Sequence, residues 1–157
     1  MVPFIPRHML GYAPFGYRMP RKKPPSRRRN HTTEVIIGDP ESGGSHLVFT
    51  ISEYDDGMPC EVFLDTRTPT PEYVGLLDSF AILLSHALQW GVPLDHLVDK
   101  FTYTRFSPAG IVRGHDRISI CTSVPDLVFR HMGIRYLDMD HLAHKTKETG
   151  HGSADIQ

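Results

Sequence analysis

The side chains best suited to binding an anion gather between residues 105 and 117 of this 157-residue chain. The four that could contact a phosphate group are Arg105, Arg113, His115 and Arg117. A guanidinium group binds phosphate through two parallel hydrogen bonds. Gly110 and Gly114 in the same loop would let the main chain approach a ligand closely. The alternative is that the arginines pair with carboxylates of their own domain and hold the loop in place.

Two cysteines, Cys60 and Cys121, are too few for a disulfide framework, and we expect both to be reduced. Cys60 falls in a predicted hairpin turn. Cys121 lies just before a predicted helix N-terminus, where a thiolate is favoured. They could form a redox pair only if the fold brings them together. The alternative is two unrelated cysteines, one of them buried as a small apolar residue.

A pair of histidines near the C-terminus suggests a metal site. His141 and His144 are three residues apart, so one helical face could present both. Asp138 and Asp140 lie beside them. A closed site needs further ligands from elsewhere, and no cysteine pair is at hand. The sequence therefore favours a solvated or capping role and predicts no metal site.

Four carboxylates surround one predicted hairpin: Glu53, Asp55, Asp56 and Glu61. Paired carboxylates serve acid–base catalysis only where burial separates their pKa values. On a tight turn beside Gly57 we expect them to face water, so we predict no catalytic residue among them.

The first 33 residues carry eight lysines and arginines and no acid. The rest of the chain therefore holds nine bases against all 18 acids. Six of the cations form a cluster that could contact nucleic acid or a partner: Arg21, Lys22, Lys23, Arg27, Arg28 and Arg29. Tyr12, Phe15 and Tyr17 could stack on bases. The alternatives are a linker, or an arm that folds back on the acidic body.

The elements that position these groups indicate an α+β fold. Residues 32–66 alternate apolar and polar side chains between turn signals, which predicts a three-stranded antiparallel meander. Apolar residues at intervals of three and four predict about three helices, near 71–90, 94–102 and 123–137. Ser123 is the expected cap of the last helix, with Asp126 as its capping-box partner.

The chain is expected to divide into three parts. Residues 1–31 form an extended basic arm rich in Pro and Arg, residues 32–145 the folded domain, and residues 146–157 a flexible tail. No apolar stretch is long enough to cross a membrane, and the N-terminus lacks the pattern of a secretory signal. We therefore expect a cytoplasmic location and no membrane partner.

Four separated stretches resemble one known family: Ser52–Phe63, Leu88–Leu94, Phe101–Gly110 and Thr122–Asp126. Together they are similar to the TSCPD domain that follows the catalytic barrel of adenosylcobalamin-dependent (class II) ribonucleotide reductases. The resemblance extends over residues 19–144. It departs from the family at Val124, where the family's motif has Cys, at Cys60, where it has Gly, and at His115, where it has Asn. The motif here is therefore expected to act as a helix cap.

The resemblance implies a link to deoxyribonucleotide synthesis. Ribonucleotide reduction needs several cysteines and a large barrel, so we expect this chain to catalyse nothing alone and to bind no cofactor alone. Adenosylcobalamin would come only by association with a reductase. The predicted role is an accessory or regulatory domain whose partner is a reductase catalytic subunit, a nucleotide or nucleic acid. The alternatives are a nucleic-acid-binding protein that uses the basic arm, and a small phosphate-site enzyme built on the 105–117 loop.

Overall fold

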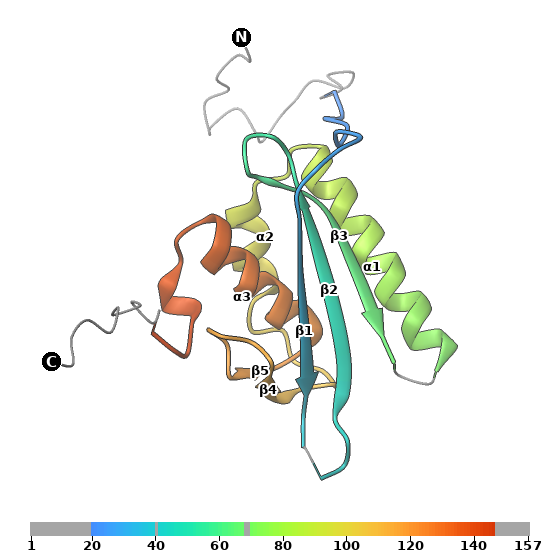
Figure 1. Cartoon of the computed structure of the whole chain (residues 1–157), viewed down its shortest axis with the longest axis vertical. Helices are drawn as coiled ribbons and strands as arrows, with labels where there is room; N and C mark the ends of the chain where they lie inside the picture. Colours follow the sequence, from blue (N-terminus) through green and yellow to red (C-terminus); the bar gives the residue numbers. More distant parts are fainter. Residues whose placement is uncertain (1–19, 40, 68–69, 147–157) are drawn as a thin grey trace, which may run out of the picture.

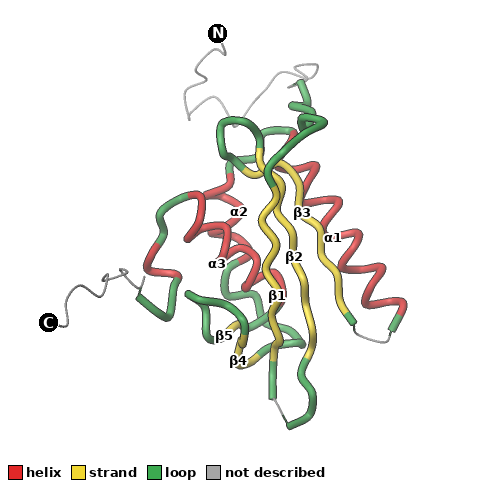
Figure 2. Tube along the Cα trace, viewed as in Figure 1, coloured by secondary structure: helices red, strands yellow, loops and turns green. Residues whose placement is uncertain are grey.

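The computed structural model describes residues 20–39, 41–67 and 70–146, and confirms the α+β class (Figures 1 and 2). The strands are β1 (Asn30–Ile37), β2 (Ser45–Glu53), β3 (Pro59–Thr66), β4 (Gly110–Arg113) and β5 (Ile120–Cys121). The helices are α1 (Pro71–Gln89), α2 (Leu94–Phe101) and α3 (Val124–Tyr136), followed by the short 3₁₀ helix η2 (Asp140–Leu142). Residues 1–19 of the predicted arm and 147–157 of the predicted tail lie outside the described residues.

The first three strands form the predicted meander. β1 pairs with β2 along its whole length, and β2 pairs with β3, both antiparallel. Strand alternation puts Leu47, Phe49 and Ile51 on one face, where all three are buried. β1 begins at Asn30, two residues before the predicted start.

The sheet has five strands in the order β3-β2-β1-β4-β5. The predicted three-stranded meander is therefore only part of the sheet. β4 pairs with β1, with Arg113 opposite Ile36, and β5 pairs with β4. β4 comes from the 105–117 stretch that the sequence predicts as a loop, and β5 lies between that stretch and the predicted third helix. They have four and two residues, too few for alternation to show. β4 joins the sheet because β1 supplies a distant partner, and β5 joins it through β4.

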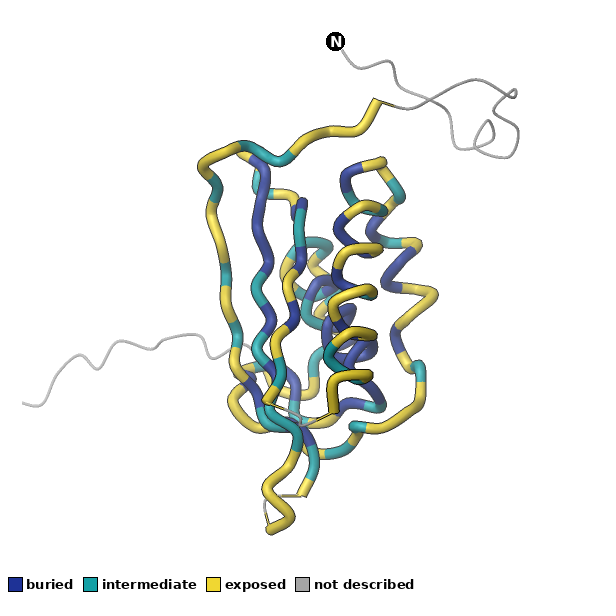
Figure 3. The backbone as a smooth tube through the Cα atoms, turned by 90° about the vertical axis from the view of Figure 1, so that its right-hand side faces the viewer, coloured by how far each residue is buried: buried dark blue, intermediate teal, exposed yellow. Residues whose placement is uncertain are grey.

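The molecule has two layers, because the helices all lie on one side of the sheet (Figure 3). α1 packs against β3 and α2 against α3. Two aromatic rings hold Phe129 of α3 in this layer: Phe101 stacks on it with ring centroids 5.1 Å apart, and Phe80 meets it edge-on at 6.3 Å. The opposite face of the sheet is left without a helical cover. No helix in the described ranges is both long and apolar enough for a membrane span.

Candidate functional site

The residues of the predicted phosphate loop lie in three different environments. Arg113 is exposed on the outer face of β4, and Arg105 is exposed in the loop before it. Arg117 is held by the protein itself, because its side chain donates to Asp140 (2.8 Å) and to the Lys145 carbonyl (2.9 Å). The pairing alternative therefore describes Arg117, while Arg113 has no charged partner among the described residues.

His115 is buried rather than presented to a ligand. Its Nδ1 accepts hydrogen bonds from the backbone N–H groups of Arg117 (3.1 Å) and Ile118 (3.0 Å). Nδ1 is therefore unprotonated, and Nε2 donates to Nδ1 of His131, 2.9 Å away. Burial lowers the pKa of both rings, to about 3 for His131, so both are neutral at pH 7.

Gly114 allows a close approach, but to the protein's own strand and not to a ligand. Its φ is 92°, and a Cβ built there would lie 2.5 Å from the Glu34 carbonyl oxygen of β1. Glycine is thus required for β4 to leave the sheet at this point.

The two thiols are buried and unrelated. Cys60 lies in β3, not in a hairpin turn as predicted, and Cys121 in β5. Four strand spacings of about 4.8 Å separate these two edges of the sheet, far beyond the reach of a disulfide. Burial raises the pKa of both thiols, to about 11 for Cys121, so the expected thiolate is not favoured there.

The carboxylates around the β2–β3 turn do not all face water, because Glu53 is buried. It accepts a hydrogen bond from the Tyr136 hydroxyl (2.9 Å) and pairs with His31 (3.0 Å) and Arg135 (3.4 Å). Burial by itself would raise the pKa of Glu53, but these hydrogen bonds and charges lower it overall. Glu53 therefore ties α3 to the sheet and is no free acid or base.

At the start of α3, sequence reasoning expected Asp126 as a capping partner but missed that its carboxylate is the centre of a buried network. Ser123 is the N-cap, and its hydroxyl accepts from the Asp126 N–H (3.1 Å). The Asp126 carboxylate accepts from the backbone N–H groups of Thr122 (3.0 Å) and Tyr103 (2.7 Å). It also pairs with Arg130 (2.9 Å), whose guanidinium donates to the Leu142 carbonyl and lies over the Tyr103 ring. The i, i+4 spacing of Asp126 and Arg130 was the available signal.

Of the two histidines of the suggested metal site, His144 has a structural contact and His141 is exposed. His144 Nδ1 accepts from the Ser119 N–H (3.2 Å). Asp140 is paired with Arg117. In the part of the chain that the structure describes, no group of three or more His, Cys, Asp or Glu side chains could hold a metal ion.

The described part of the basic arm lies on the acidic body. Lys22 pairs with Asp56 (2.9 Å), which helps to lower the pKa of that carboxyl together with the Met58 N–H, and Arg28 pairs with Glu61. Arg21 donates to Gln89 of α1 (2.7 Å). Three further cations are exposed and have no charged partner among residues 20–39, 41–67 and 70–146: Lys23, Arg27 and Arg29.

The outer face of the sheet has no described helix over it (Figure 3). Ile111 (56% exposed) and Ile120 (49% exposed) are paired across β4 and β5. Ile36 and Val48 continue the apolar surface across β1 and β2, and Arg113 stands beside Ile36. Exposed apolar side chains grouped with an unpaired guanidinium are typical of protein-binding surfaces.

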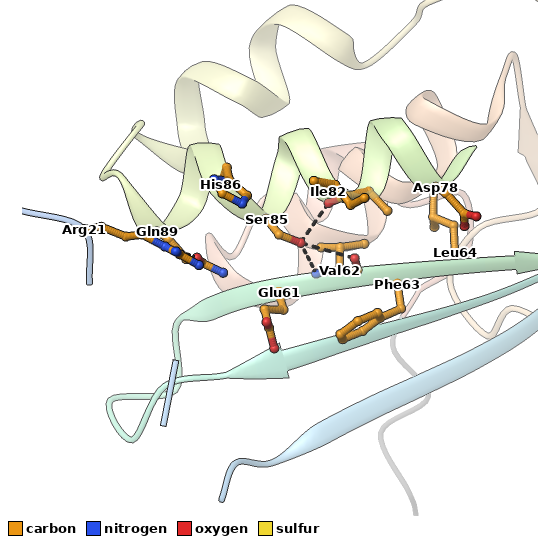
Figure 4. Close-up of a pocket in the computed structure, with 11 residues that line it drawn as sticks. Arg21, Glu61, Val62, Phe63, Leu64, Asp78, Ile82, Ser85, His86 and Gln89 are labelled. Carbon is orange, nitrogen blue, oxygen red and sulfur yellow. Dashed lines mark hydrogen bonds between the residues drawn. The ribbon is translucent and has the colours of Figure 1, made fainter. Parts of the chain in front are cut away.

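A groove of about 390 Å³ lies at the other edge of the sheet, between β3 and α1 (Figure 4). Side chains of α1 bond to the outer edge of β3 here: Ser85 accepts from the Val62 N–H (2.9 Å), and Gln89 donates to the Cys60 carbonyl (3.0 Å). Ile82 of α1 lines the groove, whereas the side chains of Phe63 and Glu61 point from β3 to the side away from α1 (Figure 4).

Comparison with known proteins identifies relatives. The profile of the family described as TSCPD domain matches residues 15–136. Over 124 residues, 79% of the chain, the sequence is 41% identical to the vitamin B12-dependent ribonucleotide reductase of Bradyrhizobium diazoefficiens and 38% identical to that of Agrobacterium fabrum. The reductase of the same description from Rhodopirellula baltica is 33% identical over 143 residues, 89% of the chain. The matches cover 10%, 9% and 13% of these relatives, so the chain spans about a tenth of their length. No solved structure matches.

Proposed function

Because this chain belongs to the TSCPD domain family, we propose that it is an accessory domain in deoxyribonucleotide synthesis that binds a ribonucleotide reductase catalytic polypeptide and performs no chemistry of its own. The relatives named above are vitamin B12-dependent ribonucleotide reductases in which the matching part is about a tenth of the protein. Such a domain acts by docking.

The observation that carries this proposal is the open outer face of the sheet, above all the exposed pair Ile111 and Ile120 beside Arg113. Apolar side chains of this size gain free energy when a partner covers them. The polar groups best suited to chemistry point the other way, because the thiols, His115 and Glu53 are all buried and engaged inside the domain.

Adenosylcobalamin belongs, in this proposal, to the catalytic polypeptide. The described residues offer no group of metal-ligating side chains, and both thiols have raised pKa values. We therefore assign no step of the reaction to this chain. Ribonucleotide turnover by the purified chain alone, supplied with adenosylcobalamin and a dithiol, would contradict the proposal.

Nucleic-acid binding is a second candidate, favoured by the three exposed arm cations Lys23, Arg27 and Arg29. It predicts binding to single- or double-stranded DNA that weakens steeply as salt is raised. The accessory-domain proposal predicts instead that replacing all three by Ala leaves reductase binding nearly unchanged, since they lie away from Ile111 and Ile120.

The direct experiment uses the catalytic polypeptide of the Bradyrhizobium diazoefficiens reductase, shortened by the region that matches this chain. Mixed with the chain, it is expected to co-sediment as a complex in analytical ultracentrifugation. Independent sedimentation at concentrations of tens of micromolar would overturn the proposal, because a domain that acts by docking on this polypeptide has to bind it at such concentrations.

A further inference from the structure

Residues 20–29 of the basic arm, which we call the clasp, lie across one end of the domain, beside the C-terminal end of α1 and the β2–β3 turn (Figure 1). Near the start of the clasp, the Lys22 N–H donates to the Gln89 carbonyl of α1 (2.9 Å). At its other end, the Arg29 carbonyl accepts from the Glu53 N–H of β2 (2.9 Å). The clasp therefore bridges the helix layer and the sheet.

Two cations of the clasp hold it against carboxylates of the body. The Lys22 ammonium pairs with Asp56 (2.9 Å) and lies over the Tyr54 ring, 4.0 Å from its centre. The Arg28 guanidinium pairs with Glu61. The side chains of both pairs are in contact with water, so each pair holds the clasp only weakly.

Three further cations of the clasp are exposed and have no charged partner within the described ranges: Lys23, Arg27 and Arg29. The chain beyond residue 33 holds nine bases against 18 acids, so the body repels a polyanion while these three side chains attract one. A polyanion bound to them lies next to Lys22 and Arg28 in the chain. It therefore competes with Asp56 and Glu61 for these two cations.

We propose that a single strand of nucleic acid opens the clasp, binding Lys22 and Arg28 in place of the two carboxylates. Phosphate oxygens accept charge-assisted hydrogen bonds from ammonium and guanidinium groups as carboxylates do. A strand also carries phosphates at short, regular intervals, so one molecule can contact all five cations. In the closed state the body neutralises two of the five, and it thereby weakens binding of the strand. This inference rests on the nucleic-acid candidate described above and concerns the regulation of that site.

The test is the salt dependence of binding of the full-length chain to an oligothymidylate of about 20 nucleotides, followed by fluorescence anisotropy. The logarithm of the binding constant falls with the logarithm of the salt concentration, by about 0.7 for each phosphate that the protein neutralises. Lys22→Ala with Arg28→Ala removes two contacts of the open clasp and should lower this slope by about 1.4. The control, Lys100→Ala with Arg67→Ala, removes the same charge from exposed positions outside the arm and should leave the slope unchanged.

A second pair of variants weakens the closed state without removing a cation. Asp56→Asn with Glu61→Gln should strengthen binding by between about twofold and thirtyfold, because two competing ion pairs are lost. The control, Asp65→Asn with Asp99→Asn, changes the net charge equally at exposed positions for which the described residues show no contact with the clasp. It should strengthen binding much less.

The outcomes separate the clasp from the binding itself. The same salt slope with and without Lys22 and Arg28 would overturn the proposal and leave nucleic-acid binding in place, because the strand would then use other cations alone. Equal gains from the two pairs of carboxylate variants would also overturn it, since net charge would explain both. Absence of binding by every variant would overturn both the opening of the clasp and the nucleic-acid candidate, and would not affect docking to the reductase.

Discussion

The start of α3 and the outer face of β4 are close in sequence but treat their charged groups in opposite ways. Around α3, Asp126 and Arg130 are both buried, and each satisfies backbone groups of other segments. On β4, Arg113 is exposed beside apolar side chains and has no charged partner within the described ranges. The Asp126–Arg130 pair stabilises the fold, whereas Arg113 and its apolar neighbours remain exposed and can contact a partner. The domain therefore separates the groups that hold it together from those that can meet a partner.

The largest effect is expected at Asp126. Asp126→Ala leaves the Arg130 charge and the Tyr103 and Thr122 N–H groups without their buried partner. Breaking a buried ion pair from one side costs about 3–5 kcal/mol of unfolding free energy. Chemical denaturation should show this loss. Asp99→Ala, which removes an exposed carboxylate of α2, should change stability by less than about 0.5 kcal/mol. Equal effects at the two positions would show that the Asp126 cluster is not what fixes α3.

The next effect is a loss of stability in mild acid. The folded-state pKa of His131, about 3, lies below its ordinary value of 6.5, so the unfolded chain binds more protons between these values. The stability that the neutral His131 ring contributes to the folded state is fully present above pH 6.5. As pH falls from 6.5 towards 3, the unfolding free energy decreases by up to about 1.4 kcal/mol per pH unit. His131→Asn retains an acceptor for His115 but does not titrate.

Denaturation midpoints of the His131→Asn protein should therefore fall less between pH 6.5 and 5 than those of the unmodified chain. Glu53, with its lowered pKa, adds its own loss only at lower pH. Parallel pH profiles for the two proteins would contradict a buried neutral His131.

A smaller effect is expected at the helix cap. Ser123→Ala removes the acceptor of the Asp126 N–H but leaves the carboxylate cluster in place. The cost should be about 1 kcal/mol. Ser123→Asp, which can still cap, should recover most of it. An unchanged midpoint for Ser123→Ala would show that the Asp126 carboxylate alone sets the start of α3.

These residues also show how far the sequence could predict the molecule. Alternation identified Leu47, Phe49 and Ile51 as buried, and apolar spacing identified the three helices, because both signals are local. β4 was missed, since it pairs with Ile36, more than 70 residues away along the chain, and β5 was missed because it has only two residues and pairs with β4. Glu53 was expected in water, yet Tyr136, 83 residues later, buries and binds it. Local patterns do not contain such contacts.

The smallest change in stability is expected at Arg113, and it separates two arginines of one predicted loop. Arg117→Ala breaks the contacts with Asp140 and the Lys145 carbonyl and should cost about 0.2–1 kcal/mol of unfolding free energy. Arg113→Ala should cost less than about 0.2 kcal/mol, which is too small for a thermal melt to resolve, because the described residues give Arg113 no ion pair. A larger loss at Arg113 than at Arg117 would mean that Arg113 is structural.

The most direct test of the account is the affinity of the chain for the shortened reductase polypeptide, measured by isothermal titration calorimetry. Ile111→Lys places a charge in the exposed apolar pair of β4 and β5 and should weaken binding by at least about tenfold, or about 1.4 kcal/mol. Leu83→Lys changes an even more exposed leucine on α1 (70% against 56% for Ile111) and should leave the affinity as it is. Both variants should unfold as the unmodified chain does. The opposite pattern, with binding lost in Leu83→Lys and retained in Ile111→Lys, would contradict the claim that the open sheet face is the docking surface.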